Sequence, residues 1–285
     1  MIKQLILLFI LIQVITATSI TNCGTISASG NYELVNDVSS GGSAQCFLFT
    51  KNDTYFDCQG YNVNQTVSSS GAFKYSNLHN ITVKNCNITN FDLGIDAIDI
   101  NNSIVQNNTI YPFNLVGISY VKNNSNQYNI SILDNFISSG LIIAGNAFDF
   151  SYIDNLNISN NIINNTNAIL ITSTPNNLSL TNNQFSLNDY GVILSESTSV
   201  LSSNNTFTNQ TYATLITTGN IFNSTNDKYF QQNNQILATT NGSINYQAHI
   251  TNNIIYHENS TYTNFSQSKF IYTTGNSFLF DSPIP

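Results

Sequence analysis

Apolar and polar residues alternate along the chain in a short pattern that recurs with a period in the twenties. In eight six-residue segments the sixth residue is always Ile or Phe, the first is apolar in six cases, and Asn dominates positions three and four. The fourth positions lie 22, 27, 26, 22, 22, 48 and 23 residues apart, and we interpret 48 as two repeats of 24. Such a period indicates a solenoid. The segments are Val83–Ile88, Val105–Ile110, Ile132–Ile137, Ile158–Ile163, Leu180–Phe185, Ser202–Phe207, Ile250–Ile255 and Thr273–Phe278.

The residues around these segments predict strands. They are β-branched or Asn, which disfavour helix and argue against a leucine-rich repeat of the same period. In Asn80–Lys84 every second residue is apolar, as in a strand with one buried face. Segments led by Gly94, Gly117 and Gly191 indicate a second strand in each coil. The sequence therefore predicts an all-β fold, a single right-handed parallel β-helix.

The coils of this solenoid are expected to run from about Asn31 to Phe278. The sixth residue of each segment should then face the core. These residues are Ile88, Ile110, Ile137, Ile163, Phe185, Phe207, Ile255 and Phe278.

The paired Asn residues suit a sharp turn between strands. Asn tolerates a positive φ better than any residue except Gly. Asn side chains in successive coils, about 4.8 Å apart, can hydrogen-bond along the axis. We therefore predict an amide ladder through Asn108, Asn135, Asn161, Asn183 and Asn205.

The phase of the repeat is lost between residues 208 and 249. Thr217–Phe222 and Asn233–Ile236 offer two registers that do not fit one even period. The sequence predicts an irregular insertion here, with Tyr229, Phe230 and Tyr246 in a protruding loop.

The first residues have the features of a secretory signal peptide. Lys3 precedes an apolar run from Leu5 to Ile15 that is too short to span a bilayer, and Ala17 and Ser19 form a small-residue cleavage pattern. An uncleaved anchor or a buried strand is the alternative. We expect residues 1–19 to be removed, 20–60 to form an N-terminal cap and first coil, 61–280 the coils and 281–285 a tail. The expected mature chain is secreted or at the cell surface, with no membrane span.

All four cysteines lie in the first third of the chain, and an even number in an exported protein indicates disulfides. We predict that Cys23 and Cys46 pair and tie the N-terminal cap to an early coil. Cys58 and Cys86 should lie in neighbouring coils, where a spacing of about 4.8 Å is within disulfide reach. Zinc is the alternative, but the chain has no CxxC or HxxxH pair.

Composition narrows the classes of function. Charged residues make up 8% of the chain, the net charge is −8, and all seven basic residues are lysines. Nucleic-acid binding is not expected, because it uses clusters of Arg and Lys.

The N-terminal third carries a more specific order of motifs. Cys23–Ile26, Gly30–Leu34, Phe56–Tyr61 and Asn80–Cys86, the last reading NITVKNC, follow one another. This order resembles the start of NosD-type and related pectin-lyase-like β-helix proteins, especially secreted archaeal ones, over roughly Cys23–Phe207. The resemblance implies the fold, but such folds host lyases, hydrolases, epimerases, adhesins and metal-delivery proteins. Copper, with which NosD-type proteins are associated, is not expected, because the one Met is lost with the signal peptide, the four Cys are assigned to disulfides and the three His are isolated.

One acidic cluster, Asp92, Asp96 and Asp99, is the candidate for chemistry. It could bind calcium, which needs only oxygen ligands, or consist of solvated turn residues. It could also supply the acid and base of an inverting glycoside hydrolase, whose carboxyl groups lie about 6.5–9.5 Å apart. A lyase needs a cation such as Arg beside acidic ligands, so no turnover of acidic polysaccharides is expected. Asp149 and other isolated acidic residues are interpreted as turn residues.

Seventeen N-x-[ST] sequons are present, a modest excess over what the composition alone produces. The glycosylation candidates are Asn52, Asn64, Asn101, Asn123, Asn209, Asn223, Asn241 and Asn259. The tyrosines considered for a sugar-binding face are Tyr152, Tyr190, Tyr212 and Tyr246.

These features favour a non-enzymatic extracellular protein, a glycosylated cell-surface, adhesion or carbohydrate-binding module. Its expected partners are extracellular polysaccharides or surface-layer components, and calcium is the one candidate cofactor. The first alternative is a pectin-lyase-like polysaccharide lyase or glycoside hydrolase that combines the acidic cluster with Lys74, Lys84 or Lys122. The second is a periplasmic metal-binding factor.

Overall fold

The computed structural model describes most of the chain between residues 17 and 280. The described ranges are 17–41, 45–65, 71–123, 127–140, 145–166, 169–172, 177–188, 190–197, 199–210, 212–219, 221–230, 234–238, 247–251, 254–257, 264–265, 270–274 and 277–280.

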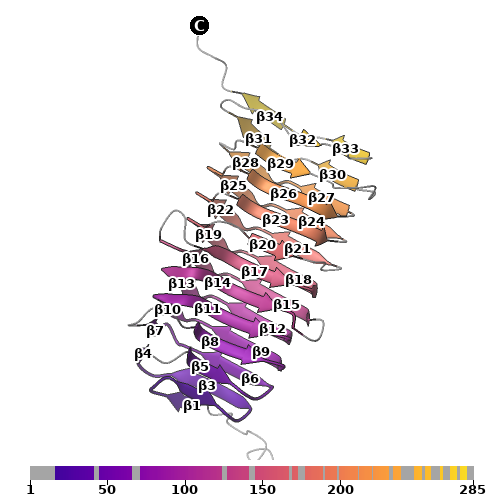
Figure 1. The fold of residues 1–285 in the computed structure, drawn as a ribbon. Helices are drawn as coiled ribbons and strands as arrows, with labels where there is room; N and C mark the ends of the chain where they lie inside the picture. The colour runs from indigo at the N-terminus through magenta and orange to yellow at the C-terminus, as the bar shows by residue number, and fades with distance from the viewer. Residues whose placement is uncertain are drawn as a thin grey trace, which may run out of the picture.

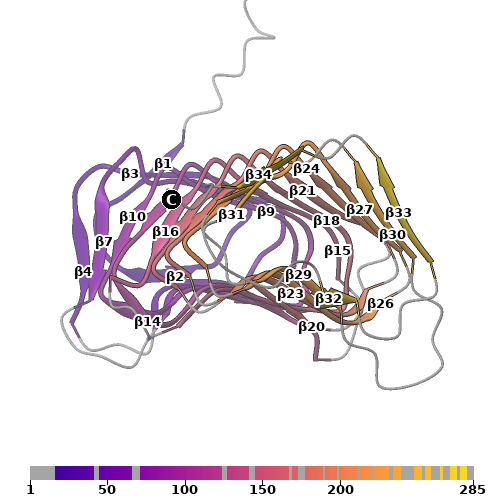
Figure 2. The same ribbon diagram turned by 90° about the horizontal axis from the view of Figure 1, so that it is seen from above.

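The chain forms a right-handed parallel β-helix, as the repeat predicts. Each coil adds one strand to each of three sheets, and every pairing between neighbouring coils is parallel (Figure 1). We name the sheets A, B and C; the chain passes from A to C to B in each coil. Seen along the axis, the three sheets enclose one elongated core (Figure 2).

The strands of sheet A are β1 (Thr18–Ile20), β3 (Gly30–Leu34), β6 (Thr54–Asp57), β9 (His79–Lys84), β12 (Asn101–Gln106), β15 (Gln127–Leu133), β18 (Ile153–Ser159), β21 (Leu178–Thr181), β24 (Val200–Ser203), β27 (Ile221–Thr225), β30 (Gln247–Thr251) and β33 (Phe270–Thr274). Those of sheet C are β4 (Val38–Ser40), β7 (Asn62–Gln65), β10 (Asn87–Thr89), β13 (Thr109–Ile110), β16 (Phe136–Ser138), β19 (Ile162–Asn164), β22 (Gln184–Ser186), β25 (Thr206–Thr208), β28 (Lys228–Phe230), β31 (Ile254–His257) and β34 (Ser277–Phe280).

Sheet B contains the predicted glycine-led strands, since Gly94, Gly117 and Gly191 lie in β11, β14 and β23. Its strands are β2 (Gly24–Ile26), β5 (Gln45–Phe49), β8 (Gly71–Ser76), β11 (Phe91–Ile98), β14 (Phe113–Val121), β17 (Asn146–Ser151), β20 (Ile169–Thr172), β23 (Tyr190–Ser197), β26 (Tyr212–Gly219), β29 (Asn234–Ala238) and β32 (Asn264–Phe265).

The sixth residue of each repeat is in the core wherever its side chain is described. All six such residues are fully or almost fully buried, which confirms the prediction for Ile88, Ile110, Ile137, Ile163, Phe185 and Phe207. Ile255 and Phe278 have side chains outside the described residues. In sheet C the row continues as an aromatic stack, with Phe185 and Phe207 ring centroids 4.7 Å apart. Stacked rings of this kind add to the stability that burial alone supplies.

The two Asn positions of the repeat have separate tasks. The third residue adopts a left-handed backbone, with φ between 55° and 58° at Asn85, Asn160, Asn182 and Asn204. The fourth residue is buried and turns its amide along the axis. The left-handed residue turns the chain out of sheet A, and the next residue satisfies the polar groups that the turn buries.

The predicted amide ladder is present. Each amide Nδ2 donates to Oδ1 of the Asn in the next coil, at 3.0 Å from Asn108 to Asn135 and 3.1 Å from Asn161 to Asn183. Each Oδ1 also accepts the backbone N–H of the preceding ladder residue, and each Nδ2 also donates to a carbonyl of the previous coil. We call this row the inner ladder; its amides are Asn108, Asn135, Asn161, Asn183 and Asn205.

The inner ladder ends at Asp227, inside the stretch where the sequence lost its phase. Asp227 Oδ1 accepts from Nδ2 and the backbone N–H of Asn205, at 3.1 and 2.7 Å. Its Oδ2 accepts from the hydroxyls of Ser202 and Ser224, at 2.6 and 2.8 Å. These serines occupy the core-facing first position of their repeats, so two adjacent polar residues stand in a largely apolar row and bind one buried carboxyl group.

The prediction of an irregular insertion over 208–249 is therefore wrong for the first part of that stretch. The gap of 48 residues is 22 from Asn205 to Asp227 and 26 to Asn253. Strands β27 and β28 pair in register with their neighbours, and β26 pairs with β29 in register and with β23 through a bulge near Ser195. Tyr229 takes the sixth position and is fully buried, stacked 5.0 Å from Phe207, and Phe230 lies in β28 rather than in a loop. Tyr246 lies outside the described residues.

At the N-terminal end of the described residues, the first strand already belongs to the solenoid. Strand β1 pairs directly with β3, with Thr18 opposite Tyr32 and Ile20 opposite Leu34. A mature chain that begins at residue 20 would keep only Ile20 of this strand. The rest of the predicted signal peptide, residues 1–16, lies outside the described residues.

We expect Asn161→Ala to lower the free energy of unfolding by about 3 to 4 kcal/mol, because it leaves several buried donors and acceptors without partners. Asn161 is fully buried and bonds to the coils on both sides. The control is Asn160→Gly, an exposed neighbour with a left-handed backbone that glycine adopts freely, which should change little. Equal losses for both variants in urea unfolding would contradict a special role for the inner ladder.

Asp227→Asn should change how stability depends on pH. Burial raises the pKa of the Asp227 carboxyl above its ordinary value of 3.8, despite the hydrogen bonds from Ser202, Asn205 and Ser224. The folded state therefore holds the proton more tightly than the unfolded state, so this stabilisation is full below 3.8 and is lost as pH rises towards the folded pKa. The variant has no such proton, and its stability relative to the wild type should increase over that range. Unfolding measured at several pH values checks this, and a constant difference between the two proteins would refute it.

Candidate functional site

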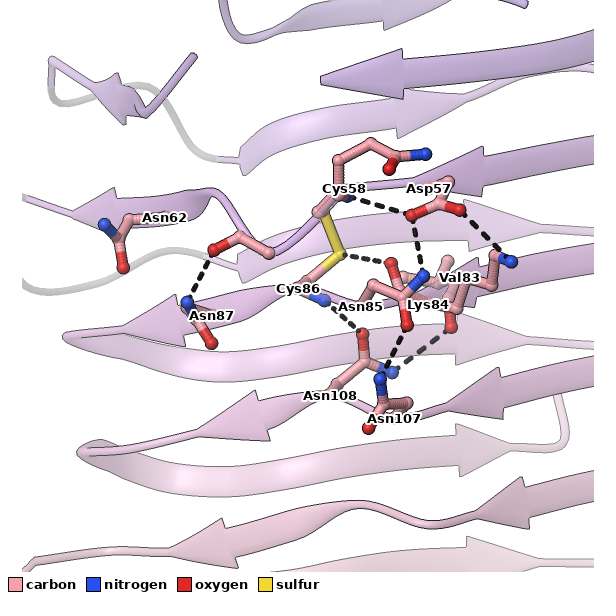
Figure 3. The surroundings of a disulfide bond; sticks show 12 residues. Asp57, Cys58, Asn62, Val83, Lys84, Asn85, Cys86, Asn87, Asn107 and Asn108 are labelled. Atoms are coloured by element: carbon pink, nitrogen blue, oxygen red, sulfur yellow. Dashed lines mark hydrogen bonds and ion pairs between the residues drawn. A yellow bond between two sulfur atoms is a disulfide. The ribbon is translucent and has the colours of Figure 1, made fainter. Parts of the chain in front are cut away.

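Both predicted disulfides are present. Cys23 pairs with Cys46, with Cα atoms 4.7 Å apart, and ties the start of β2 to the next coil. Cys58 pairs with Cys86 at 4.8 Å. Cys86 occupies the ladder position of its coil, and its backbone N–H donates to Asn108 Oδ1 (Figure 3). The second disulfide therefore extends the inner ladder towards the N-terminus by a covalent bond.

Beside this disulfide, Asp57 ends a short row of exposed amides. Asn107 Nδ2 donates to Asn85 Oδ1 at 2.7 Å, and Asn85 Nδ2 donates to Asp57 Oδ1 at 2.8 Å (Figure 3). Lys84 Nζ lies 3.1 Å from Asp57 Oδ2. Partial burial raises the pKa of Asp57, but the hydrogen bonds from Asn85 and Gln59 and the Lys84 ammonium outweigh it, so the pKa is lowered. Lys84 is thus engaged with a structural carboxylate.

A longer exposed row runs along sheet A. Each Nδ2 donates to the acceptor of the preceding coil, from Asn80 to Asp53 at 2.6 Å through to Asn177 and Asn155 at 2.8 Å. We call this row the outer ladder; its residues are Asp53, Asn80, Asn102, Asn129, Asn155 and Asn177. The direction of its hydrogen bonds is opposite to that of the inner ladder.

The structure gives Asp92, Asp96 and Asp99 separate partners. Asp92 Oδ1 accepts from Asn114 Nδ2 at 2.8 Å, and Asp99 Oδ1 accepts the backbone N–H of Asn123 at 2.8 Å. Asp99 is buried at the turn that follows β11, whereas Asp92 and Asp96 are partly exposed. Within the described ranges, no group of three or more His, Cys, Asp or Glu side chains is placed to hold a metal ion. The geometry therefore offers no support for a calcium site built from these three residues.

Asp96 instead belongs to a polar row across the outer face of sheet B. It lies opposite Lys74 of β8 on one side and Ser119 of β14 on the other, and Ser119 lies opposite Asp149 of β17. Lys74 Nζ is 3.2 Å from Asp96 Oδ2. We call Lys74, Asp96, Ser119 and Asp149 the carboxylate row. Two strand spacings separate its carboxylates, so their Cα atoms lie about 9.6 Å apart.

Asp149 is the member that the sequence analysis missed. It was interpreted as a turn residue, but it lies in the middle of β17 between the buried Phe148 and Phe150. Burial raises the pKa of its carboxyl. Alignment of the glycine-led strands could have found it, because Ile95-Asp96-Ala97, Ile118-Ser119-Tyr120 and Phe148-Asp149-Phe150 occupy the same place in successive coils.

A second feature is a groove on the outer face of sheet A, of about 480 Å³. Its central row is in register across four coils, with Asn157 opposite Ser179, Ser179 opposite Leu201 and Leu201 opposite Asn223. Leu156 and Leu178 form a buried floor, and Leu201 is 47% exposed. The remaining lining residues are Asn155, Asn177 and Ser199. No charged residue lines this groove, so amides, hydroxyls and one exposed apolar side chain define its chemistry.

The sequons and tyrosines are distributed over several faces. Of the glycosylation candidates, Asn123 and Asn209 are exposed; Asn52, Asn64, Asn101 and Asn223 are partly buried; Asn241 and Asn259 lie outside the described residues. Asn52, Asn64 and Asn101 use Oδ1 as a hydrogen-bond acceptor. Tyr152 is 43% exposed beside sheet A, whereas Tyr190 and Tyr212 begin strands of sheet B. These tyrosines therefore do not form one face.

The described residues contain no helix with the length and hydrophobicity that a membrane span requires. No protein-family model matches the sequence, and a comparison with curated proteins finds no relative.

Several solved structures are similar to this chain. The catalytic domain of a GH87 α-1,3-glucanase variant in complex with nigerose aligns at 12% identity and a TM-score of 0.50, covering 91% of this chain and 64% of that one. The periplasmic alginate epimerase AlgG aligns at 12% and 0.48, covering 90% and 76%. The Streptococcus pneumoniae surface protein and adhesin PfbA aligns at 10% and 0.41, covering 93% and 89%. At such identities the similarity shows the fold alone.

Proposed function

We propose that this chain is a non-enzymatic extracellular β-helix protein that binds an uncharged polysaccharide in the groove of sheet A. The observation that carries the proposal is the groove's lining of amides and hydroxyls around the exposed Leu201, without a charged group. Both amides and hydroxyls donate and accept hydrogen bonds, which matches sugar hydroxyls, and an apolar side chain suits the C–H surface of a sugar ring.

The shape of the groove also suits a linear chain. Its central row extends over three strand spacings, about 14 Å along the axis, and its side chains repeat at the same interval from coil to coil. A rigid sheet holds these groups in place before a ligand arrives, so little ordering entropy opposes binding. The two disulfides fit an oxidising extracellular environment.

We place the proposed glycosylation on exposed sequons outside the groove, such as Asn123 and Asn209. Asn157, Asn177 and Asn223 line the groove and are sequons, so a glycan on any of them would occupy the binding surface. The N-terminal motifs resemble those of NosD-type proteins. The role we favour is retention at the cell surface through binding to polysaccharide or surface-layer components.

The substitution Leu201→Asp tests the proposal. It places a charge in the centre of the groove on an exposed position, so we expect at least a tenfold loss of affinity for the best-binding neutral polysaccharide without a change in melting temperature. The probes are soluble glucans, mannans, galactans and xylans, with alginate and polygalacturonate for comparison, and the protein is made in a host without N-glycosylation.

The matched control is Leu187→Asp, an equally exposed leucine in a turn outside the groove, which should bind within twofold of the wild type. The proposal fails if the wild type binds none of the neutral polymers. It also fails if both aspartate variants bind as well as the wild type.

The carboxylate row supports a second candidate function, glycoside hydrolysis. Asp96, held beside Lys74, suits a base, and Asp149, whose pKa is raised by burial, suits a general acid. Their Cα atoms lie about 9.6 Å apart, close to the 6.5–9.5 Å that separates the two carboxyl groups of inverting hydrolases.

If the carboxylate row is catalytic, the wild type should release reducing sugar from a polysaccharide. Asp96→Asn and Asp149→Asn should each lower that rate by a factor of about 100 or more, because each removes one partner of an acid–base pair. Asp92→Asn is the control, since Asp92 lies in the same strand but bonds to Asn114. Absence of release by the wild type would eliminate this candidate and leave the binding function intact.

A further inference from the structure

The outer ladder has a polarity, and its two ends differ. Every amide in it directs an N–H towards the N-terminal end of the solenoid and its carbonyl towards the C-terminal end. At the N-terminal end Asp53 accepts the last N–H, at 2.6 Å. A carboxylate suits this place because it only accepts hydrogen bonds.

At the other end, Asn177 has no following amide. The next coil places Ser199 there, as the backbone shows: the carbonyl of Asn177 accepts from the N–H of Leu156, and the carbonyl of Ser199 accepts from that of Leu178. Asn177 Nδ2 donates to Asn155, but no described residue donates to Asn177 Oδ1. The last acceptor of the outer ladder, Asn177 Oδ1, therefore receives no hydrogen bond from the described residues.

This unused acceptor lies in the groove of sheet A. Asn155, Asn177 and Ser199 are three of its lining residues, and Leu201 follows Ser199 by two positions on the same strand face. The amides of a hydrogen-bonded chain polarise one another, which makes the carbonyl at its free end a better acceptor than that of an isolated Asn. The groove thus combines a strengthened acceptor with an adjacent exposed apolar side chain.

We propose that Asn177 Oδ1 is the anchoring acceptor for a hydroxyl of the bound glycan and selects a hydroxyl over a carboxylate at that position. The inference rests on the function proposed above. A sugar hydroxyl donates to this oxygen, whereas the carboxylate of an acidic sugar only accepts and is repelled by it. At this position of the groove the outer ladder therefore favours a hydroxyl over a carboxylate.

Extending the ladder by one coil tests this. In Ser199→Asn the new Nδ2 can donate to Asn177 Oδ1, as each ladder amide does to the one before it, and so consume the acceptor. We expect the Kd for the best-binding neutral polysaccharide to rise about fivefold to tenfold, the effect of one hydrogen bond of ordinary strength. The comparison variant Ser199→Leu adds similar bulk and removes the hydroxyl but supplies no donor, so we expect its Kd to rise clearly less than that of Ser199→Asn.

Binding is measured by calorimetry on the full chain from a host without N-glycosylation, with melting temperatures as a check on folding. Equal Kd values for the wild type and Ser199→Asn would overturn the inference, and so would equal losses for the Asn and Leu variants, which would indicate a steric effect alone. In both cases a loss in Leu201→Asp would preserve the proposed function. A wild type that binds no neutral polysaccharide would overturn both.

Discussion

The turn out of sheet A is the constraint on which the rest of this solenoid depends. Each coil must turn sharply there, and the turn buries backbone donors and acceptors that no strand can pair. The chain solves this with two adjacent residues: a left-handed Asn, such as Asn160, and a buried Asn, such as Asn161, whose amide bonds to the coils above and below. Because each amide depends on its neighbours, successive coils are held in register by side chains as well as by strands. Disruption of one amide therefore affects three coils.

A ladder of amides has a direction, and a directed row must end. At the end that receives N–H groups, Asn would leave its own N–H without a partner, whereas Asp has none to satisfy. Among the described residues, Asp53, Asp57 and Asp227 end a row of amides in this way, and Asp37, Asp92 and Asp134 each accept from a single side-chain amide. Their surroundings decide their pKa values. Hydrogen bonds from Asn62 lower the pKa of Asp37 at the surface, whereas burial raises that of Asp227. Much of the acidic character of the chain is thus architectural, which explains why Asp92 resembled a candidate ligand in the sequence.

The parts of this structure that repeat can be predicted from the sequence. The prediction fails where a position of the repeat is filled by a residue of another type. Ile137 and Asn135 were assigned correctly because their types recur at a steady period, and the cysteine pairs followed from the spacing between coils. Asp227 and Tyr229 were missed because neither matches the Asn and the Ile or Phe that define the repeat, although each fills the same position. Asp149 was missed because sheet B has a weaker pattern, in which only the leading small residue recurs. The partner of Asp96 is Lys74, which lies 22 residues away in the preceding coil. Such contacts between coils cannot be recognised in a single sequence until the register of the strands is known.

The requirement that every amide of a ladder finds a hydrogen-bond partner also limits where this molecule can bind a ligand. An amide whose N–H and carbonyl are both engaged by its neighbours has little to offer a ligand, so an unbroken ladder such as Asn80 to Asn129 makes an inert surface. Binding capacity arises where a row is interrupted, because an unpaired acceptor or an exposed apolar side chain then faces solvent. On sheet A the interruption falls between Asn177 and Ser199, next to Leu201, and the groove lies at that place. On sheet B the interruption is of another kind, since the carboxylate row stands between Leu48 and Leu170 in the same register. A repetitive solenoid can thus acquire a specific site through one or two substitutions in an otherwise saturated row, without any change of fold.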